Sequence, residues 1–534
     1  MGISTKRVFA FGLFLVSLLG ISCNSNAMSP YVWSEHSALK CNEQYLPPTN
    51  TKRDATVHMR VNAVRNEWET AQLLVRSDEQ PLKNLRIKIG SLTCGTRHIA
   101  SQNVEVRSAY YVAFKRKDAS TQEFVKGTTP DPLVPFETSM TLPANRTQAF
   151  YIQVHVPRTA YPGKYSAPVT LLWDGGQQTH YLDVHVWDVT LPDKPQVVTA
   201  FGLARDMTVK MHGVESNEDE AQRLTEKYYE MMLDYGLSAY ELPVAFDSPK
   251  AKKYLDDPRV TSYLIPGADW KTTDSLSKTI DLLKRKNWWK RAYVYPVDEP
   301  VTTQSYAKLR ACVERLRTLA PDIRAVSPFF CKPADQPGKT YMDLVGDLVK
   351  IHCCCTGYYD EDTTVAHQMT QMAKTGRGEP WWYVCCNPRE PYANLFVSQQ
   401  GMEHRILPWQ MKQHDILGLL YWRVNHWTLD DKGTTDPWHD MATVKDIDPN
   451  LYGDGSLFYP GNKVGIDGPV PSVRMVNLRD GLEDYGLLDL YEKRFGRKAT
   501  KTLISKLSKS LKDYSHNPEE LESVRVDILE QLTK

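Results

Sequence analysis

Net charge and long apolar runs are what this sequence most clearly lacks. Its 65 lysine and arginine residues stand against 64 aspartate and glutamate residues, a formal net charge of +1. The chain therefore has no global basic field that could hold nucleic acid, and no acidic block that would form a solvating tail. Beyond the N-terminal segment there is no run of about 18 apolar residues, so we do not expect the mature chain to span a membrane.

Cysteine is also scarce, which excludes a disulfide-rich scaffold. There are 10 cysteines in 534 residues, and Cys41 and Cys94 could pair in an oxidising compartment. The run His352-Cys353-Cys354-Cys355 and the pair Cys385-Cys386 lack the CxxC spacing of a zinc site. Because neighbouring side chains on a strand point to opposite faces, we interpret these cysteines as small buried hydrophobic residues. No metal site and no cofactor is expected.

The N-terminus has the features of an export signal. Lys6 and Arg7 precede an apolar stretch, residues 8–21, that is short for a membrane span. The stretch ends in Leu19-Gly20-Ile21-Ser22-Cys23, which resembles a bacterial lipobox with Cys23 as the acylated residue. Cleavage near Ala27 is the alternative. We therefore expect a signal peptide over 1–23 and an exported protein anchored by lipid in the bacterial cell envelope, in the periplasm or at the outer-membrane surface.

Residues 28–193 show the period of two that is typical of half-buried strands. Val57, Met59, Val61 and Ala63 alternate with polar residues, and the same alternation recurs in 85–89, 150–156 and 182–186. Turn signals such as Pro162-Gly163 separate these runs. The pattern predicts an antiparallel β-sandwich.

After a proline-containing linker, Leu191–Pro195, short strand candidates alternate with amphipathic helices. Most of these candidates are followed by a helical pattern, which predicts a (β/α)8 TIM-like barrel over 196–495. The third strand–helix unit has the weakest pattern of the series. After the barrel, a C-terminal helical segment is expected over 496–534. The strand candidates are 197–203, 238–242, 261–265, 292–295, 323–326, 349–355, 381–384 and 417–422.

Asp298 and Glu299 are the candidate catalytic residues, because barrel active sites lie at the C-terminal ends of the strands. Pro296 has no N–H to continue a central ladder, so the pair should lie on the loop after the fourth strand. We expect Pro300 to hold Glu299 in an extended conformation. Adjacent carboxylates repel, so the pKa of one should rise, giving a general acid beside an ionised partner. The alternative is an ordinary solvated acidic loop.

Plain phenylalanine rings are few, while tryptophan and tyrosine are abundant: 14 Phe stand against 13 Trp and 28 Tyr. Flat rings stack on sugar faces while Asn, Arg and Tyr bind hydroxyls, so Trp422, Asn425 and Trp427 are candidate substrate-binding residues. Filling of the core is the alternative for any one ring. Stacking on nucleic acid is disfavoured because no basic groove accompanies the rings. Six tryptophans gather near the last two strand candidates: Trp381, Trp382, Trp409, Trp422, Trp427 and Trp438.

Several segments together resemble glycoside hydrolase family 123, the retaining β-N-acetylgalactosaminidases and their relatives. The similarity covers the predicted barrel, and the preceding sandwich fits the N-terminal domain of that family. The segments that carry it are 295–300 (YPVDEP), 381–394 (WWYVCCNPREPYAN), 421–427 (YWRVNHW), 453–461 (GDGSLFYPG), 471–474 (PSVR) and 479–485 (RDGLEDY).

The resemblance implies a substrate-assisted reaction on a glycan or glycolipid, in which the 2-acetamido group of the sugar attacks C1. Asp298 would orient and stabilise that group, and Glu299 would protonate the leaving oxygen and later activate water. A tyrosine hydroxyl would help to hold the acetamido group. Asp454 could reach sugar hydroxyls, although it is also a good turn residue. The candidate tyrosines are Tyr295, Tyr358 and Tyr383.

Two alternatives stay open. A hydrolase of the same fold could act on a different sugar, with Glu241 or Asp454 as nucleophile. A degenerate barrel could instead form an inactive surface glycan-binding lipoprotein that holds sugar through its tryptophans. The sequence does not indicate an oligomeric state. Finally, we predict that the charged residues Arg474, Arg479, Glu483 and Asp484 form ion pairs that close the barrel.

Overall fold

The computed structural model describes residues 29–117, 124–266, 273–427 and 451–534, with 429–430, 433–434, 436–444 and 448 in between. The predicted signal peptide and Cys23 lie outside the described residues. Within these ranges, no helix is both long and apolar enough to cross a bilayer.

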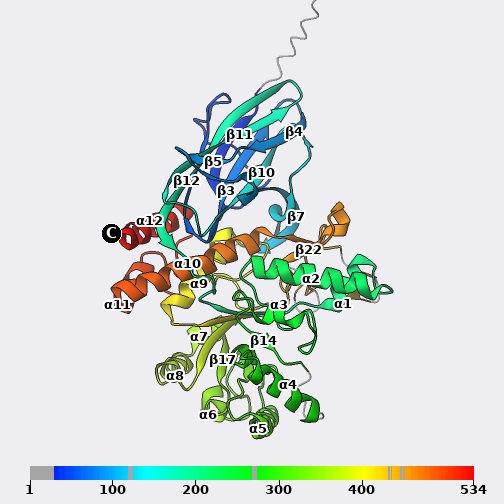
Figure 1. Ribbon diagram of the computed structural model, residues 1–534, viewed down its shortest axis with the longest axis vertical. Coiled ribbons are helices and arrows are strands. Elements are labelled where there is room, and N and C mark those ends of the chain that lie inside the picture. Colours follow the sequence, from blue (N-terminus) through cyan, green and yellow to red (C-terminus); the bar gives the residue numbers. More distant parts are fainter. Residues whose placement is uncertain are drawn as a thin grey trace, which may run out of the picture.

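Two β-sheets pack face to face in the N-terminal part (Figure 1). The first has the order β1 (Tyr31–His36), β3 (Glu67–Ser77), β10 (Arg146–Val156), β7 (Val104–Lys117) and β8 (Phe124–Pro135). The second has the order β2 (His58–Arg65), β12 (Gly176–Thr190), β11 (Gly163–Trp173), β4 (Leu82–Ile89) and β9 (Met140–Leu142). In addition, β5 (Leu92–Cys94) pairs with β11, and β6 (Arg97–Ile99) pairs with β5.

Alternation along the strands builds the core between these sheets. In β12, Leu182, Val184 and Val186 are buried while the residues between them are at least partly exposed. One pairing differs from the predicted antiparallel arrangement, because β2 runs parallel to β12. The chain turns at Asn66, in the left-handed conformation, and crosses from β2 into β3 of the other sheet. Strand β2 is therefore left at a sheet edge, where it joins β12 in parallel.

Parallel strands dominate the second half of the chain. One sheet has the order β13 (Val198–Phe201), β19 (Gly418–Tyr421), β18 (Glu379–Val384), β17 (Ile351–Cys355) and β16 (Val326–Phe329), and a second sheet pairs β14 (Tyr263–Leu264) with β15 (Ala292–Tyr293). Parallel bridges also join Phe201 to Ala239 and Val294 to Ala325. The N–H of Leu264 donates to the carbonyl of Tyr240 at 2.6 Å. Neighbouring segments thus link the two sheets at both ends.

Helices connect these strands and lie outside them (Figure 1). Between β13 and β19 they are α1 (Arg205–His212), α2 (Glu218–Asp234), α3 (Ala251–Leu255), α4 (Thr273–Arg285), α5 (Thr303–Leu319), α6 (Tyr341–Val345), α7 (Thr356–Glu361), α8 (Thr363–Lys374) and α9 (Gly401–Gln413). Short 3-10 helices lie at Ser101–Asn103, Trp289–Arg291 and Gly461–Val464.

The C-terminal elements return to the N-terminal sheets. Helix α10 crosses beneath those sheets and α12 lies beside β12 (Figure 1). After β19 the order is β20 (Leu429–Asp430), β21 (Gly433–Thr434), β22 (Phe458–Pro460), β23 (Pro469–Pro471), α10 (Val473–Phe495), α11 (Arg497–Ile504) and α12 (Pro518–Thr533).

Two of the four residues predicted to form ion pairs, Arg474 and Asp484, pair with other elements, whereas Arg479 pairs with Asp480 of α10 itself. Glu483 forms a backbone hydrogen bond in place of an ion pair. Arg474 contacts Asp131 of β8 at 2.7 Å, and Arg479 binds Gln153 of β10 at 2.9 Å. Glu483 accepts the backbone N–H of Trp68 at 3.2 Å. These contacts follow from the path of α10, whose polar side chains face the seam between the two halves of the molecule.

Cys41 and Cys94 do not pair; both thiols are free. Cys41 belongs to the large core shared with the helices, whereas Cys94 packs against the core between the two N-terminal sheets. The disulfide that the sequence allowed does not form, because the two residues contribute to different cores.

Candidate active site

The loop after β15 carries the adjacent carboxyls, as the sequence predicts. The backbone pairing of this strand continues through Val294 and stops before Pro296. The Ser327 hydroxyl of β16 donates to the carbonyl of Val297, in the loop, at 2.8 Å. Glu299 has φ of 41°, a left-handed conformation and not the extended one expected. Pro300 disfavours the right-handed helical conformation at Glu299, the residue before it. The left-handed conformation that Glu299 adopts costs about 1 kcal/mol or more.

Each carboxyl of the pair accepts a hydrogen bond from a tyrosine. The Tyr295 hydroxyl donates to Oδ1 of Asp298 at 2.7 Å, and the Tyr383 hydroxyl, from β18, donates to Oε1 of Glu299 at 2.5 Å. Asp298 is exposed, whereas Glu299 is half-buried. Two chemically similar neighbours therefore have different partners and different access to water.

The surroundings of Glu299 favour its protonated form. Burial raises the pKa of its carboxyl, the negative charge of Asp298 raises it further, and the hydrogen bond from Tyr383 opposes both effects. A carboxyl with a raised pKa beside an open carboxylate suits a general acid with an ionised partner.

A third carboxyl, Asp454, lies in a tight Gly-Asp-Gly turn after β19. Trp422 Nε1 and the Tyr421 hydroxyl both donate to its Oδ1, at 3.1 and 3.2 Å. Among the described residues no side chain donates to Oδ2. Burial raises the pKa of Asp454 to about 6, although these hydrogen bonds act to lower it.

The turn itself is fixed from both sides. Gly455 has φ of 70°, and a Cβ there would lie 2.2 Å from the Trp422 ring. Arg474 donates to the carbonyl of Gly453 at 2.8 Å, while its other nitrogens bind Asp131. The seam between the two halves of the molecule thus holds the turn that carries Asp454.

Cys386 is near both Asp454 and Glu299. Its thiol, just past the end of β18, is near enough to Asp454 and Glu299 for the negative charge of each to oppose its ionisation. Asp298, Glu299, Asp454 and their tyrosine partners therefore share the edge at which the strands end.

Tyr358 and Trp422 are half-buried at the same edge. The Tyr358 hydroxyl, in α7, donates to Oδ2 of Asp362 at 3.1 Å, and Lys332 lies 3.3 Å from that carboxylate. Trp422 is tilted against His426, with ring centroids 4.8 Å apart.

Asn425 and Trp427 lie in the interior instead. The Asn425 amide bonds both backbone groups of Ala204 and the Thr208 hydroxyl, and so fixes the start of α1. Trp427 is 1% exposed and donates to the carbonyl of Phe458 at 3.0 Å. This geometry favours a structural role for both residues in place of the predicted contact with substrate.

Two residues that the sequence did not single out belong to this edge. Tyr240 packs edge-on against Tyr295, with ring centroids 6.3 Å apart, and Arg423 follows Trp422. The charges of Asp298 and Arg423 both act on the pKa of Tyr240. Their positions just after strand segments were the available signal. Glu241, the alternative nucleophile, is exposed beside Tyr240.

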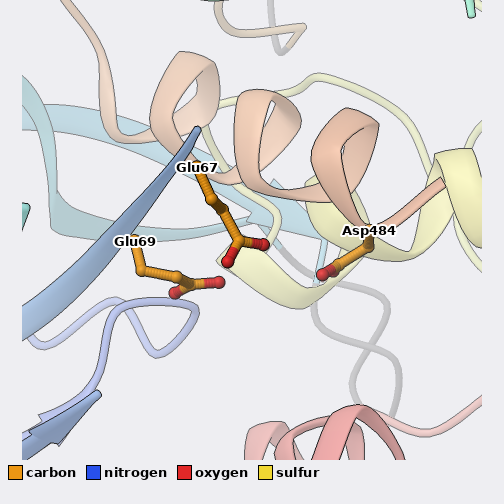
Figure 2. A group of neighbouring side chains, drawn as sticks. All are labelled: Glu67, Glu69 and Asp484. Carbon is orange, nitrogen blue, oxygen red and sulfur yellow. The ribbon is translucent and has the colours of Figure 1, made fainter. Parts of the chain in front are cut away.

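One cluster elsewhere has the spacing of metal ligands. Oxygen atoms of Glu67, Glu69 and Asp484 lie within 4.8 Å of one another (Figure 2). Arg525 contacts all three carboxylates, at 2.8, 2.7 and 2.6 Å, so a guanidinium already compensates this charge. We therefore interpret the cluster as a structural ion-pair network.

Comparisons with known proteins bear on the family and the fold of this chain. Residues 268–491 match the sequence model of the glycoside hydrolase 123 catalytic domain, and residues 40–172 match that of the glycoside hydrolase 123 N-terminal domain. A comparison with curated proteins gave no match.

Among solved structures, a family 123 glycoside hydrolase from Clostridium perfringens, described in a study of glycolipid glycan hydrolysis, has the same fold. Its TM-score is 0.68 at 13% identity, over 95% of this chain and 97% of that one. Two other solved structures are much less similar. A β-glucuronidase from Bacteroides uniformis has a TM-score of 0.30 at 13% identity, over 76% of this chain and 48% of that one. Xylanase 10B from Thermotoga maritima has a TM-score of 0.28 at 10% identity, over 55% of this chain and 96% of that one.

Both domain models match in order along the chain, and the C. perfringens fold is shared over nearly its whole length. The chain therefore belongs to glycoside hydrolase family 123 and is a glycoside hydrolase.

Proposed function

We propose that this hydrolase is a retaining exo-glycosidase that removes terminal β-linked N-acetylgalactosamine by substrate-assisted catalysis. The observation that carries the proposal is the contrast between the paired carboxyls. Glu299 is half-buried with a raised pKa, and Asp298 is open to solvent. Retention without an enzymic nucleophile needs one acid and one carboxylate that stays charged.

The reaction would proceed in two steps. In the first, the Glu299 carboxyl gives its proton to the glycosidic oxygen as the bond from C1 to that oxygen breaks. The acetamido oxygen of the sugar attacks C1, and the ionised Asp298 accepts the acetamido N–H and stabilises the developing positive charge. In the second step, the Glu299 carboxylate takes a proton from water, which attacks C1 and opens the oxazolinium ring with net retention.

The partner tyrosines have positioning roles in this scheme. Tyr295 holds Asp298 at 2.7 Å and Tyr383 holds Glu299 at 2.5 Å. Tyr358 and Trp422 lie at the same edge and would line the sugar site, and Asp454 would offer Oδ2 to a sugar hydroxyl. The C. perfringens relative is described for glycolipid glycans, which supports a glycolipid as one substrate of this chain.

The fold that presents these groups is, we infer, a distorted (β/α)8 barrel. Parallel bridges and one backbone hydrogen bond connect the two parallel sheets in both directions. One interior cluster takes buried side chains from β13, β15, β16, β17, β18 and β19, with Tyr240 and Leu264 packed against it. These contacts support a closed ring of strands whose C-terminal ends form the active-site edge.

A different sugar is the second candidate, favoured by one observation. Asp454 is a buried carboxyl whose charge, like that of Glu299, acts on the Cys386 thiol, and one of its oxygens is free of side-chain donors among the described residues. It could serve as a nucleophile on a substrate without an acetamido group.

Aryl glycosides of β-GalNAc, β-GlcNAc and β-Gal separate these candidates. The proposal predicts turnover of β-GalNAc, with losses of at least about a hundredfold in Glu299→Gln and Asp298→Asn. A strongly activated aryl leaving group, which needs no proton, should restore much of the first step in Glu299→Gln and little in Asp298→Asn. Turnover of β-Gal, lost in Asp454→Asn, would favour the second candidate instead.

We also propose export and acylation at Cys23, supported by Lys6, Arg7 and the apolar stretch that precedes the cysteine. A labelled fatty acid supplied to a bacterial host should be incorporated into the wild-type protein and not into Cys23→Ala. Label in neither protein would contradict acylation.

A further inference from the structure

Cys385 and Cys386 form a vicinal pair at the active-site edge. Strand β18 ends at Val384, and the two thiols that follow lie 3.8 Å apart, both half-buried. On a strand, neighbouring side chains would point to opposite faces. The pair can share one side only because the strand has already ended.

The cysteines of β17 show the contrast. Cys353 and Cys355 lie in the interior cluster and Cys354 in the outer core, and all three are buried. They follow the alternation of a strand and behave as small core residues. The interpretation of the cysteines as small buried hydrophobic residues therefore fits Cys353–Cys355 but does not fit Cys385 and Cys386.

The backbone holds the pair in a tight turn. The N–H of Cys385 donates to the carbonyl of Asn387 at 2.9 Å. The buried Asn394 amide donates to the carbonyls of Cys385 and Pro388, at 2.9 and 2.8 Å. The thiols thus meet within a constrained loop.

The two thiols have unequal acidity. A hydrogen bond from Cys385 lowers the pKa of the Cys386 thiol, and the same bond together with burial raises the pKa of Cys385. Since the thiolate is the nucleophile in thiol chemistry, this difference favours Cys386 as the attacking group and Cys385 as the resolving one.

We propose that Cys385 and Cys386 are a redox-active vicinal dithiol whose closure to a disulfide switches off hydrolysis. The Cys386 thiolate attacks a small-molecule disulfide, forms a mixed disulfide and releases one thiolate. Cys385, losing its proton to solvent, then attacks Cys386 Sγ and releases the second thiol. Two protein thiols are oxidised and one disulfide is reduced to two thiols.

Closure should disturb the acid because the sulfur atoms must approach from 3.8 Å to about 2.05 Å. The ring so formed includes the peptide between the two cysteines, so the backbone of this turn must change. Tyr383 lies two residues before Cys385 and holds Glu299. A shift of Tyr383 would misplace the proton donor.

The test uses the purified, reduced chain and oxidised glutathione, with intact mass and peptide mapping as the primary measurement. We expect a loss of two hydrogens, mapped to a bond between Cys385 and Cys386. Phenylarsine oxide, which bridges two adjacent thiols, should bind once and block this oxidation. These readouts do not depend on the proposed function, so they separate a failure of this inference from a failure of the glycosidase proposal.

Hydrolysis of whichever aryl glycoside the enzyme turns over gives the second readout. Oxidation should lower the rate of the wild type at least about tenfold, and dithiothreitol should restore it. Cys385→Ser and Cys386→Ser should keep the activity and lose its sensitivity to oxidation. Cys331→Ser, which removes another half-buried thiol, should remain sensitive.

Three results would overturn the proposal. The first is a stable mixed disulfide at Cys386 without closure, and the second is a bridge from Cys386 to Cys355. The third is closure that leaves the rate unchanged.

Discussion

The two adjacent carboxyls show how single residues acquire different chemistry. Asp298 and Glu299 share a loop, yet Tyr295 holds one and Tyr383, from another strand, holds the other. Burial and the charge of Asp298 raise the pKa of Glu299. The raised pKa, the open carboxylate and the tyrosine partners together support the proposed roles of acid and stabiliser.

Tyr383→Phe tests the coupling between Tyr383 and the acid. The hydrogen bond from Tyr383 lowers the pKa of Glu299, so its removal should raise that pKa further. A general acid must be protonated, so the alkaline limb of the kcat/KM profile should move to higher pH while kcat falls about tenfold or more. Tyr358→Phe, whose hydroxyl binds Asp362 instead, is the matched control. An alkaline limb that stays in place in Tyr383→Phe would contradict the coupling.

Sequence reasoning located the carboxyl pair but not all of its surroundings. Pro296 and the end of a strand were enough to place Asp298 and Glu299 on the loop. Asn425 looked equally suitable for substrate, yet its amide fixes the start of α1. The contacts that give Asn425 its structural role join residues 217 to 221 positions apart in the sequence. The local spacing of residues does not reveal such contacts.

At the scale of elements, periodicity predicted the existence of strands better than their limits. The candidate 292–295 contains β15, and 349–355 contains β17, but 323–326 overlaps β16 only at Val326. Segment 238–240 forms one bridge, with Phe201, and accepts one further backbone hydrogen bond, from Leu264, without becoming a regular strand. Short parallel strands are apolar throughout, so no alternation marks where they begin.

The Gly-Asp-Gly turn is the element most sensitive to a small change. Gly455→Ala places a methyl group 2.2 Å from the Trp422 ring at a left-handed position. We expect urea unfolding to show a loss of about 3 kcal/mol, together with a fall in kcat/KM as Trp422 and Asp454 move. Gly376→Ala, at φ of 67° with no atom within 4 Å, should lose only about 1 kcal/mol and keep its activity. Equal losses in the two variants would contradict the close packing of this turn.

At the scale of the whole molecule, α10 and α12 bind the two halves together. Arg405 of α9 and Arg525 of α12 neutralise Glu69 of β3 and Asp484 of α10 in a buried seam. Burial alone would raise the pKa of Asp484, but the two arginines hold it below its usual range. The sequence marked Asp484 as an ion-pair residue but not its partners, Arg405 and Arg525, which lie in two other helices, α9 and α12.

Arg525→Met tests this seam. It would leave three buried carboxylates short of positive charge, which typically costs about 3–5 kcal/mol. Thermal or urea unfolding should show this loss, while Lys506→Met, which breaks the exposed pair with Asp527, should change stability by less than about 0.5 kcal/mol. A loss in Arg525→Met no larger than in Lys506→Met would contradict a structural role for the cluster.

The most direct test of the central claim is inhibition by a GalNAc-derived thiazoline, a stable mimic of the oxazolinium intermediate. Substrate assistance predicts competitive inhibition of aryl β-GalNAc hydrolysis, with an inhibition constant at least about a hundredfold below KM. The same compound should bind Asp298→Asn much more weakly, because the carboxylate that faces the acetamido nitrogen is gone. Undiminished hydrolysis in the presence of the thiazoline, or equal turnover of β-Gal, would contradict the mechanism.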